Sequence, residues 1–301
     1  MKKCKIALVG TGMIGGGLAV NALMQGHPVT LYDVIPAEAV QKNIRNILSI
    51  MVSAGALTEE GAEEALSRAT FTGDLAEAVT GAAFVQECVP ERIELKRDTY
   101  RRVQEINPGA VIASSTSSLF PSQLQEGAIA PENILVGHPY NPSYLLPLIE
   151  VCGGKDTCEE AIETAMQLYE SIGKVPVRCR KEVKGFVVNK LSWGALAAAR
   201  EAVAEGICSV EDMDKAIMYG PGLRMAVTGQ LLTMSLGVQG GFREYAKKFG
   251  GASDPELYGL LAQGVEAEIA SRPAEIGNTE ESVIAYRDRM FASILKLQNL
   301  L

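Results

Sequence analysis

Histidine is rare in this sequence of 301 residues, and one of its two histidines, His138, stands where it could act as a general base. It ends the apolar run 134–138 and precedes the rigid turn Pro139-Tyr140-Asn141-Pro142. Because the pKa of histidine lies near neutral pH, an imidazole can take a hydroxyl proton while hydride leaves the same carbon. The alternative is a structural histidine beside a proline turn. The other histidine, His27, lies in the turn 25–28 and is expected at the surface.

Glu150 is the candidate partner of His138. It lies in the apolar run Leu148-Ile149-Glu150-Val151, and a carboxylate among such neighbours is costly to bury unless it is paired. Pairing with the His138 ring would fix the tautomer of the imidazole and stabilise its protonated form. An ion pair of Glu150 with Lys155 or with an arginine is the alternative.

Two further segments carry polar side chains that could hold a substrate oxygen. Residues 114–118, Ser-Ser-Thr-Ser-Ser, follow the apolar run 111–113. Their hydroxyls could contact a substrate or could cap the next helix. Asn189 lies on the apolar face of a helix that is predicted to begin near residue 185. A buried amide needs hydrogen-bond partners, which a ligand or the helix core could supply.

The segment Gly10-Thr11-Gly12-Met13-Ile14-Gly15 predicts a dinucleotide site. It follows the apolar strand 6–9 and opens the helical run 18–25. Glycines in this spacing permit a tight turn, close approach of a pyrophosphate and close packing of helix on strand. The helix N-terminus adds free N–H groups and the positive end of its dipole. An ordinary glycine-rich turn is the alternative.

Asp33 indicates which dinucleotide binds. It follows the second predicted strand, 23 residues after Gly10, where a carboxylate can accept hydrogen bonds from the adenosine ribose hydroxyls. The same carboxylate would repel a 2′-phosphate, and residues 34–36 contain no arginine to bind one. The sequence therefore favours NAD over NADP.

The alternation of apolar runs and helical stretches predicts the framework that positions these residues. It is typical of an α/β fold with a Rossmann-type, doubly wound, mostly parallel sheet. Ligands bind such sheets beyond the carboxyl ends of the strands, where His138 would lie. Candidate strands cover residues 5–9, 29–32, 83–87, 111–114, 134–138 and 147–151, and a helical insert covers 37–69.

The second half of the chain has a different pattern. No strand-like alternation recurs after residues 175–177, and residues 185–301 read as successive helices separated by glycine pairs. We therefore predict an NAD-binding domain over residues 1–184 and an all-helical C-terminal domain over 185–301 for substrate binding and dimerisation. The Leu, Ala and Met faces of these helices indicate a homodimer.

Composition narrows the class of protein. A net charge of -8 argues against nucleic acid as the main partner. Neither a signal peptide nor an apolar run near the ~20 residues that span a bilayer is found, so no membrane partner is expected. Six scattered cysteines without a Cys-x-x-Cys pair indicate reduced thiols in a cytoplasmic protein without a metal site.

Two other classes of protein are weaker interpretations. A serine hydrolase would need a Gly-x-Ser-x-Gly elbow to present its nucleophile, and the sequence has none. A non-catalytic NAD-binding protein would keep the glycine turn but would not need His138 and Glu150 together.

The motifs resemble those of the 3-hydroxyacyl-CoA dehydrogenase family along nearly the whole chain. The matching segments are, in order, residues 113–119, 137–142, 148–151 and 184–190. The resemblance implies that His138 is the catalytic base, that Glu150 orients it, and that Ser117 and Asn189 contact the substrate oxygen. Other residues that it places at the cofactor are Glu87, on the nicotinamide side, Lys96 nearby, Ser117 and Asn141.

Within this family, residues 86–92, 137–148 and 220–225 look more like the carnitine 3-dehydrogenases than the acyl-CoA enzymes. L-gulonate 3-dehydrogenase and its lens relative, lambda-crystallin, share much of this pattern. The resemblance implies NAD-dependent oxidation of the 3-hydroxyl of a short polar acid, with L-carnitine ahead of gulonate and a short 3-hydroxyacyl-CoA third. Asn189 departs from the pattern, since carnitine enzymes often carry aspartate there.

The far end of the substrate has its own candidate residues. Aromatic ring faces hold quaternary ammonium groups, and a guanidinium binds a carboxylate through two hydrogen bonds. Arg224 is the candidate for the carboxylate, and Asn141 for a further substrate contact. Each aromatic candidate has core packing as its alternative; they are Tyr140, Tyr144, Trp193, Tyr219 and Phe242.

Overall fold

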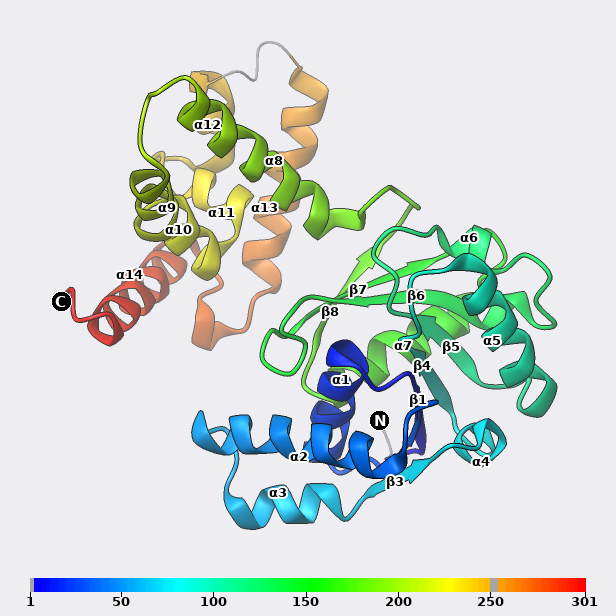
Figure 1. The fold of residues 1–301 in the computed structure, drawn as a ribbon. Coiled ribbons are helices and arrows are strands. Elements are labelled where there is room, and N and C mark those ends of the chain that lie inside the picture. Colours follow the sequence, from blue (N-terminus) through cyan, green and yellow to red (C-terminus); the bar gives the residue numbers. More distant parts are fainter. Residues whose placement is uncertain (1–2, 250–253) are drawn as a thin grey trace. The chain divides into compact units, whose positions relative to one another are not determined.

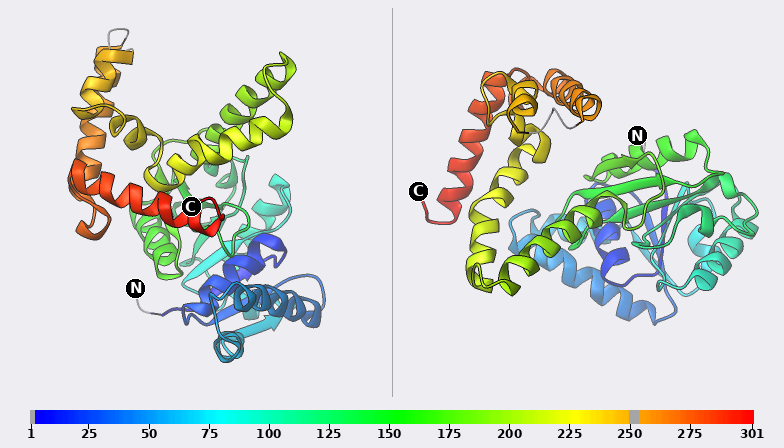
Figure 2. Two further views of the ribbon diagram at one scale, coloured as in Figure 1. Left: turned by 90° about the vertical axis from the view of Figure 1, so that its left-hand side faces the viewer. Right: turned by 90° about the horizontal axis from the view of Figure 1, so that it is seen from above.

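The computed structural model of the chain describes residues 3–249 and 254–301. The chain divides into two compact units, of which the first ends at Gly194 and the second runs from Ala195 to Leu301. The first unit contains the sheet, and the second is built of helices (Figures 1 and 2).

The sheet of the first unit has eight strands within the described residues, in the order β3-β2-β1-β4-β5-β6-β7-β8. All neighbouring pairs are parallel except β6 and β7, which are antiparallel. The predicted doubly wound, mostly parallel sheet is thus confirmed. The strands are β1 (Ile6–Val9), β2 (Val29–Tyr32), β3 (Ala69–Thr72), β4 (Phe84–Glu87), β5 (Val111–Ser114), β6 (Ile134–Pro139), β7 (Leu148–Gly153) and β8 (Val175–Cys179).

Two apolar cores cover the two faces of this sheet. Successive side chains of a strand point to opposite faces, so Ile6 and Leu8 join one core while Ala7 and Val9 join the other. Helices α1 (Met13–Met24), α2 (Ala37–Ser53), α3 (Glu59–Leu66) and α7 (Glu159–Ser171) pack on the first core. Helices α4 (Leu75–Val79), α5 (Ile93–Ile106) and α6 (Pro121–Leu124) pack on the second, and a short 3-10 turn, η1 (Pro131–Asn133), precedes β6.

The segment after the second strand differs from the prediction. Residues 37–66 form the expected helix pair, but Ala69–Thr72 then form β3, parallel to β2 at the sheet edge. The sequence Ala-Thr-Phe-Thr is too short and too exposed on both faces to show a strand pattern, and its pairing comes from contact with β2.

The second unit confirms the predicted helical half of the chain. Its core is small and includes the buried side chains of Leu232, Phe242 and Val283. None of the helices in the described part of the chain is long and apolar enough to cross a membrane. The helices are α8 (Phe186–Ala204), which begins in the first unit, then α9 (Val210–Tyr219), α10 (Pro221–Thr228), α11 (Gln230–Ser235), α12 (Gly241–Phe249), α13 (Pro255–Ser271), a 3-10 turn η2 (Ala274–Ile276) and α14 (Glu280–Leu297).

Candidate active site

The glycine turn joins β1 to α1 in a form that leaves room for a phosphate. A Cβ on Gly15 would lie 2.0 Å from the carbonyl oxygen of Gly10, so only glycine permits this close packing of turn and helix. A Cβ on Gly12 would meet no described atom within 4 Å, so the backbone there is open to a ligand. Gly12 begins α1 without a side-chain cap among the described residues, which leaves first-turn N–H groups for an anion. The residues present therefore fit a dinucleotide pyrophosphate.

Asp33 lies at the carboxyl end of β2 and contacts the glycine turn. Its Oδ2 accepts hydrogen bonds from the backbone N and the Oγ1 of Thr11, each at 2.7 Å. The hydroxyl of the buried Thr11 therefore already donates its hydrogen bond to Asp33. Asp33 lies at the edge of the sheet and remains partly exposed. The predicted contact with a ribose requires this exposure.

His138 and Glu150 form the pair that the sequence predicted. They are register partners on the antiparallel strands β6 and β7, and His138 Nδ1 lies 2.9 Å from Glu150 Oε2. Both side chains are buried, with Glu150 only 1% exposed. When Nδ1 donates its proton to the carboxylate, Nε2 keeps its lone pair and can accept a proton from a ligand. The alternative of an ion pair between Glu150 and Lys155 does not occur; Lys155 instead lies 3.9 Å from Asp156.

Glu150 also fixes the start of α8. Its other oxygen, Oε1, accepts hydrogen bonds from the backbone N of Val187 at 2.7 Å and of Val188 at 2.9 Å. These are N–H groups of the first helical turn, which have no partner within the helix. One buried carboxylate therefore connects the histidine to the helix that carries Asn189.

The remaining predicted substrate contacts of the first unit lie on segments around this pair. Ser117 is exposed in the loop after β5, and β5 runs parallel to β6 so that both strands end at the same edge of the sheet. Asn189 is half-buried on α8, one residue beyond the N–H groups that Glu150 holds. Tyr140 Oη lies 3.3 Å from Ser192 Oγ of α8, whereas Asn141 is exposed.

The prediction that Glu87 and Lys96 bind the cofactor does not fit the structure. Their side chains are 0% and 1% exposed, and Lys96 Nζ lies 2.8 Å from Glu87 Oε1. The carboxylate of Glu87 also accepts hydrogen bonds from Tyr100 and from Ser114 Oγ, so it is fully occupied within the protein. Lys96 does lie near Glu87, as predicted, but the two form a buried ion pair below the surface.

Glu91 is the acidic residue that the sequence reasoning missed at this place. Its side chain is 39% exposed, and it accepts hydrogen bonds from Thr116 Oγ1, from Ser118 Oγ at 2.9 Å and from the backbone N of Ser117 at 3.2 Å. Although burial opposes it, these bonds and the charge of Lys96 lower the pKa of Glu91. The sequence could have indicated Glu91, because it follows the end of a predicted strand by a few residues, and ligands bind beyond the carboxyl ends of such strands.

Lys174 holds the loop between His138 and Glu150. It is buried, and Nζ donates hydrogen bonds to the carbonyl oxygens of Ser143 and, at 3.1 Å, of Leu146. Ser143 Oγ in turn donates to the carbonyl of Ile14 in the first turn of α1, at 3.2 Å. The loop that carries Tyr140 is therefore fixed on both sides. Burial lowers the pKa of Lys174 to about 8.

Replacing Lys174 with methionine is expected to give a pH-dependent change in stability. The pKa of Lys174 is about 8 in the folded chain and about 10.4 in the unfolded chain, so the unfolded chain binds more protons between these values. The free energy of unfolding of the wild type should therefore rise relative to that of Lys174→Met as the pH increases through this window. Urea unfolding of both proteins at about pH 7 and about pH 10 measures the difference; a difference independent of pH would contradict this account of Lys174.

His27 is a second correction. We predicted a surface turn residue, but its side chain is 0% exposed. Its ring contacts the backbone of Cys4 and, through Nε2 at 3.1 Å, the hydroxyl of Ser171 at the end of α7. Burial lowers the pKa of His27, so this histidine is a neutral packing residue that ties two segments together.

Three other candidates for substrate contact, Arg224, Tyr219 and Phe242, lie in the second unit, whereas Trp193 is exposed on the part of α8 that belongs to the first unit. Arg224 is exposed on α10, and Tyr219 is exposed at the end of α9. Phe242 is only 4% exposed and packs on Tyr245 and Tyr258 with ring centroids 5.4 and 6.3 Å away. It is a core residue, so the prediction that it could join an aromatic cage is wrong.

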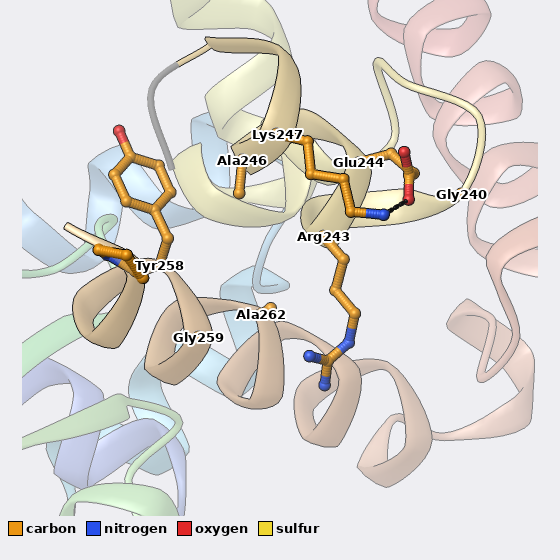
Figure 3. A pocket seen from close by; sticks show the side chains of 9 residues that line it. Gly240, Arg243, Glu244, Ala246, Lys247, Tyr258, Gly259 and Ala262 are labelled. Carbon is orange, nitrogen blue, oxygen red and sulfur yellow. Dashed lines mark hydrogen bonds and ion pairs between the residues drawn. The ribbon is translucent and has the colours of Figure 1, made fainter. Parts of the chain in front are cut away.

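A hollow of about 570 Å³ lies between α12 and α13 of the same unit (Figure 3). The charged groups on its walls already have partners, because Arg243 binds Glu266 at 2.6 Å and Lys247 binds Glu244. It therefore offers a carboxylate substrate no free cation among the described residues. Over residues 3–249 and 254–301, no group of three or more His, Cys, Asp or Glu side chains could hold a metal ion, and the six cysteines form no disulfide.

Two family descriptions match the chain. "3-hydroxyacyl-CoA dehydrogenase, NAD binding domain" matches residues 5–183, and the C-terminal domain of the same enzymes matches residues 185–279. The second match begins nine residues before the first compact unit ends at Gly194, because α8 starts in one unit and continues into the other.

Individual relatives were found among both sequences and structures. The chain is 41% identical to the L-carnitine dehydrogenase of Bacillus cereus, over 90% of this chain and 83% of that protein. It is 38% identical to the L-carnitine dehydrogenase of Streptomyces griseus, over 97% and 89%. The crystal structure of 3-hydroxybutyryl-CoA dehydrogenase from Escherichia coli K12 matches with a TM-score of 0.66 and 32% identity, over 72% of this chain and 46% of that chain.

Proposed function

This chain belongs to the 3-hydroxyacyl-CoA dehydrogenase family, and we propose that it oxidises the 3-hydroxyl of L-carnitine to give 3-dehydrocarnitine. It is an NAD-dependent oxidoreductase that acts on the CH–OH group of 3-hydroxy acids. The proposal for the chemistry depends on one observation, the contact of 2.9 Å between His138 Nδ1 and Glu150 Oε2. The choice of carnitine is supported by the similarity to L-carnitine dehydrogenases along most of the chain.

In the proposed reaction His138 takes the proton of the substrate hydroxyl on Nε2. Glu150 holds Nδ1–H, stabilises the imidazolium that forms and does not itself take the proton. The glycine turn and Asp33 would hold NAD, which would supply the acceptor for the hydride that leaves the same carbon, so that the C–H bond breaks as the C=O bond forms. The proton passes from His138 to solvent after the keto acid leaves.

Four side chains of the first unit are proposed to hold the substrate. Ser117 and Asn189 contact the reacting oxygen, and Ser117 also lies beside the cofactor. Tyr140 and Asn141 lie in the loop between β6 and β7, and Asn141 contacts the cofactor or the substrate. These roles are supported by the position of the residues at the carboxyl edge of the sheet and on α8.

The two ends of carnitine carry opposite charges and need different partners. We propose that Arg224 binds the carboxylate through two hydrogen bonds. Ring faces bind a trimethylammonium group, and Trp193 is the strongest candidate, with a side chain that is 49% exposed. Tyr140, Tyr144 and Tyr219 are further candidates.

The assembly is proposed to be a homodimer. Helices α8 and α9 expose large apolar side chains, among them Leu196, Val210 and Met218, and such a surface is typical of protein contacts. We further propose a division of labour in which residues 1–184 bind NAD and residues 185–301 bind substrate and form the dimer. A cytoplasmic location is supported by the six free thiols.

A panel of substrates tests the proposed function. NADH formation is followed at about pH 9, where proton release favours oxidation, with L-carnitine, L-gulonate, 3-hydroxybutyrate and 3-hydroxybutyryl-CoA at equal concentration. We expect kcat/KM for L-carnitine to exceed each of the others by at least ~10-fold, about 1.4 kcal/mol. A preference for gulonate or for the acyl-CoA would contradict the choice of carnitine but not the chemistry at His138. Turnover of none of the four would contradict the proposed function.

A further inference from the structure

A glutamine lies in the middle of the sheet, where the mechanism above gives it no role. Gln86 is on β4, between β1 and β5, and its side chain is 2% exposed. Strands at the centre of a parallel sheet are covered on both faces and are normally apolar throughout. A buried amide that has no contact with a ligand must therefore find all its partners in the protein.

The amide of Gln86 reaches across two neighbouring strands. Its Nε2 donates to Ser115 Oγ at 2.8 Å, just beyond the end of β5, and lies 3.2 Å from the carbonyl oxygen of Ala113. The same nitrogen lies 3.3 Å from the carbonyl oxygen of Gly137 on β6. One side chain thus connects the carboxyl ends of β4, β5 and β6.

Tyr169 of α7 fixes the direction in which this amide points. Its hydroxyl donates to Gln86 Oε1 at 2.6 Å, and burial raises the pKa of Tyr169, so the hydroxyl stays a donor. With Oε1 engaged, the NH₂ group must face β5 and β6. A Cβ on Gly137 would lie 1.8 Å from the Tyr169 hydroxyl, so the tyrosine packs directly against the strand that carries His138.

The two segments that Gln86 connects are those of the proposed chemistry. Gly137 immediately precedes His138, and Ser115 is two residues before Ser117. Resting on the proposed function, we propose that Gln86, oriented by Tyr169, is a positioning residue that sets the placement of His138 relative to the loop of Ser117. A misplacement of about 1 Å between reacting groups can cost ~10²-fold in rate, so this connection matters for turnover as well as for folding.

Two variants separate positioning from a structural role. Gln86→Leu removes the amide but leaves the Tyr169 hydroxyl without its partner, which lowers stability. The double variant Gln86→Leu with Tyr169→Phe removes both polar groups and should recover most of the lost melting temperature. We expect both variants to lower kcat by about 10- to 100-fold with KM for NAD within about 2-fold of the wild type. Recovery of kcat together with the melting temperature in the double variant would overturn the proposal.

Gln104 supplies a matched control. It is also a buried glutamine that binds the backbone of another segment, the loop before β6, through Ala130 O at 2.8 Å and Ile129 N at 3.0 Å. That loop lies at the end of β6 opposite to His138. Gln104→Leu should lower the melting temperature and leave kcat within about 2-fold of the wild type.

A spectroscopic readout works whichever substrate the wild type oxidises. The chain has only two histidines, so ¹⁵N-labelled imidazole signals report on His138 and His27 alone. Gln86→Leu should shift the ring signals of His138 and leave those of His27 in place, whereas Gln104→Leu should move neither. Unmoved His138 signals would overturn the positioning role, even if the wild type failed to oxidise carnitine. A shifted signal in an enzyme that prefers another 3-hydroxy acid would leave the role standing and reject only the substrate.

Discussion

Replacing His138 with glutamine is expected to lower kcat with L-carnitine by about 10³-fold, within the ~10²–10⁴-fold that general-base catalysis contributes. Glutamine fills similar space, but its amide cannot take the hydroxyl proton. Binding of NADH should be unchanged, because the glycine turn lies between β1 and α1 whereas His138 is on β6. Steady-state NADH formation gives kcat, and the fluorescence of bound NADH gives the affinity.

His27 provides the matched control for this experiment. His27→Gln removes the other buried imidazole and its contacts with Cys4 and Ser171, so it should lower the melting temperature. Its kcat should stay within about 2-fold of the wild type, since it is a packing residue. Near-normal turnover of His138→Gln, or an equal loss of turnover in both variants, would contradict the role of His138.

Replacing Glu150 with glutamine is expected to lower kcat by ~10²–10⁴-fold, the range found when an orienting carboxylate becomes an amide. The single amide oxygen can still accept hydrogen bonds from the N–H groups of Val187 and Val188, so α8 keeps its start. The amide NH₂ then faces His138 Nδ1 and forces the proton onto Nε2. In that tautomer Nε2 cannot accept the proton of the substrate.

The loss should be confined to the chemical step. KM for NAD should remain within about 2-fold, and the far-UV spectrum and melting temperature should stay close to those of the wild type. Glu159→Gln, which breaks the exposed ion pair with Arg178, should leave kcat unchanged and serves as the control. An effect of Glu150→Gln no larger than that of Glu159→Gln would mean that Glu150 does not orient the base.

The parts of the fold that were predictable depend on patterns within the sequence. Alternating apolar runs and helices predicted the central strands, because these strands are buried on both faces and most of them are continuous apolar runs; β4, with Gln86 and Glu87, is the exception. β3 was missed because its four residues are at most partly buried and show no apolar pattern. They form a strand only because the chain after α3 comes back beside β2 and pairs with it. The antiparallel pairing of β6 with β7 brings His138 opposite Glu150. The sequence predicted that the two side chains pair, because a lone carboxylate among apolar residues is costly to bury, but it did not predict the direction of β7.

The sequence predicted those site residues whose type is unusual for their position. A histidine at a strand end and a carboxylate in an apolar run indicated the catalytic pair. The contacts that support this pair were not predictable, because they join residues far apart in the sequence. Lys174 reaches Ser143, and Tyr169 reaches Gln86, only after α7 has packed on the sheet. Glu87 and Glu91 are four residues apart in the sequence. Only the structure shows that Glu87 is buried while the side chain of Glu91 is 39% exposed.

The most direct test of the proposed chemistry follows the hydrogen itself. L-carnitine carrying deuterium at C3 is mixed with NAD and the wild-type enzyme, and the reduced cofactor is analysed by mass spectrometry. We predict one deuterium on the nicotinamide ring, a slower transfer than with unlabelled carnitine, and about 10³-fold less labelled product in the same time with His138→Gln. Reduced cofactor without deuterium, or equal labelling by the His138→Gln variant, would contradict hydride transfer from C3 assisted by His138.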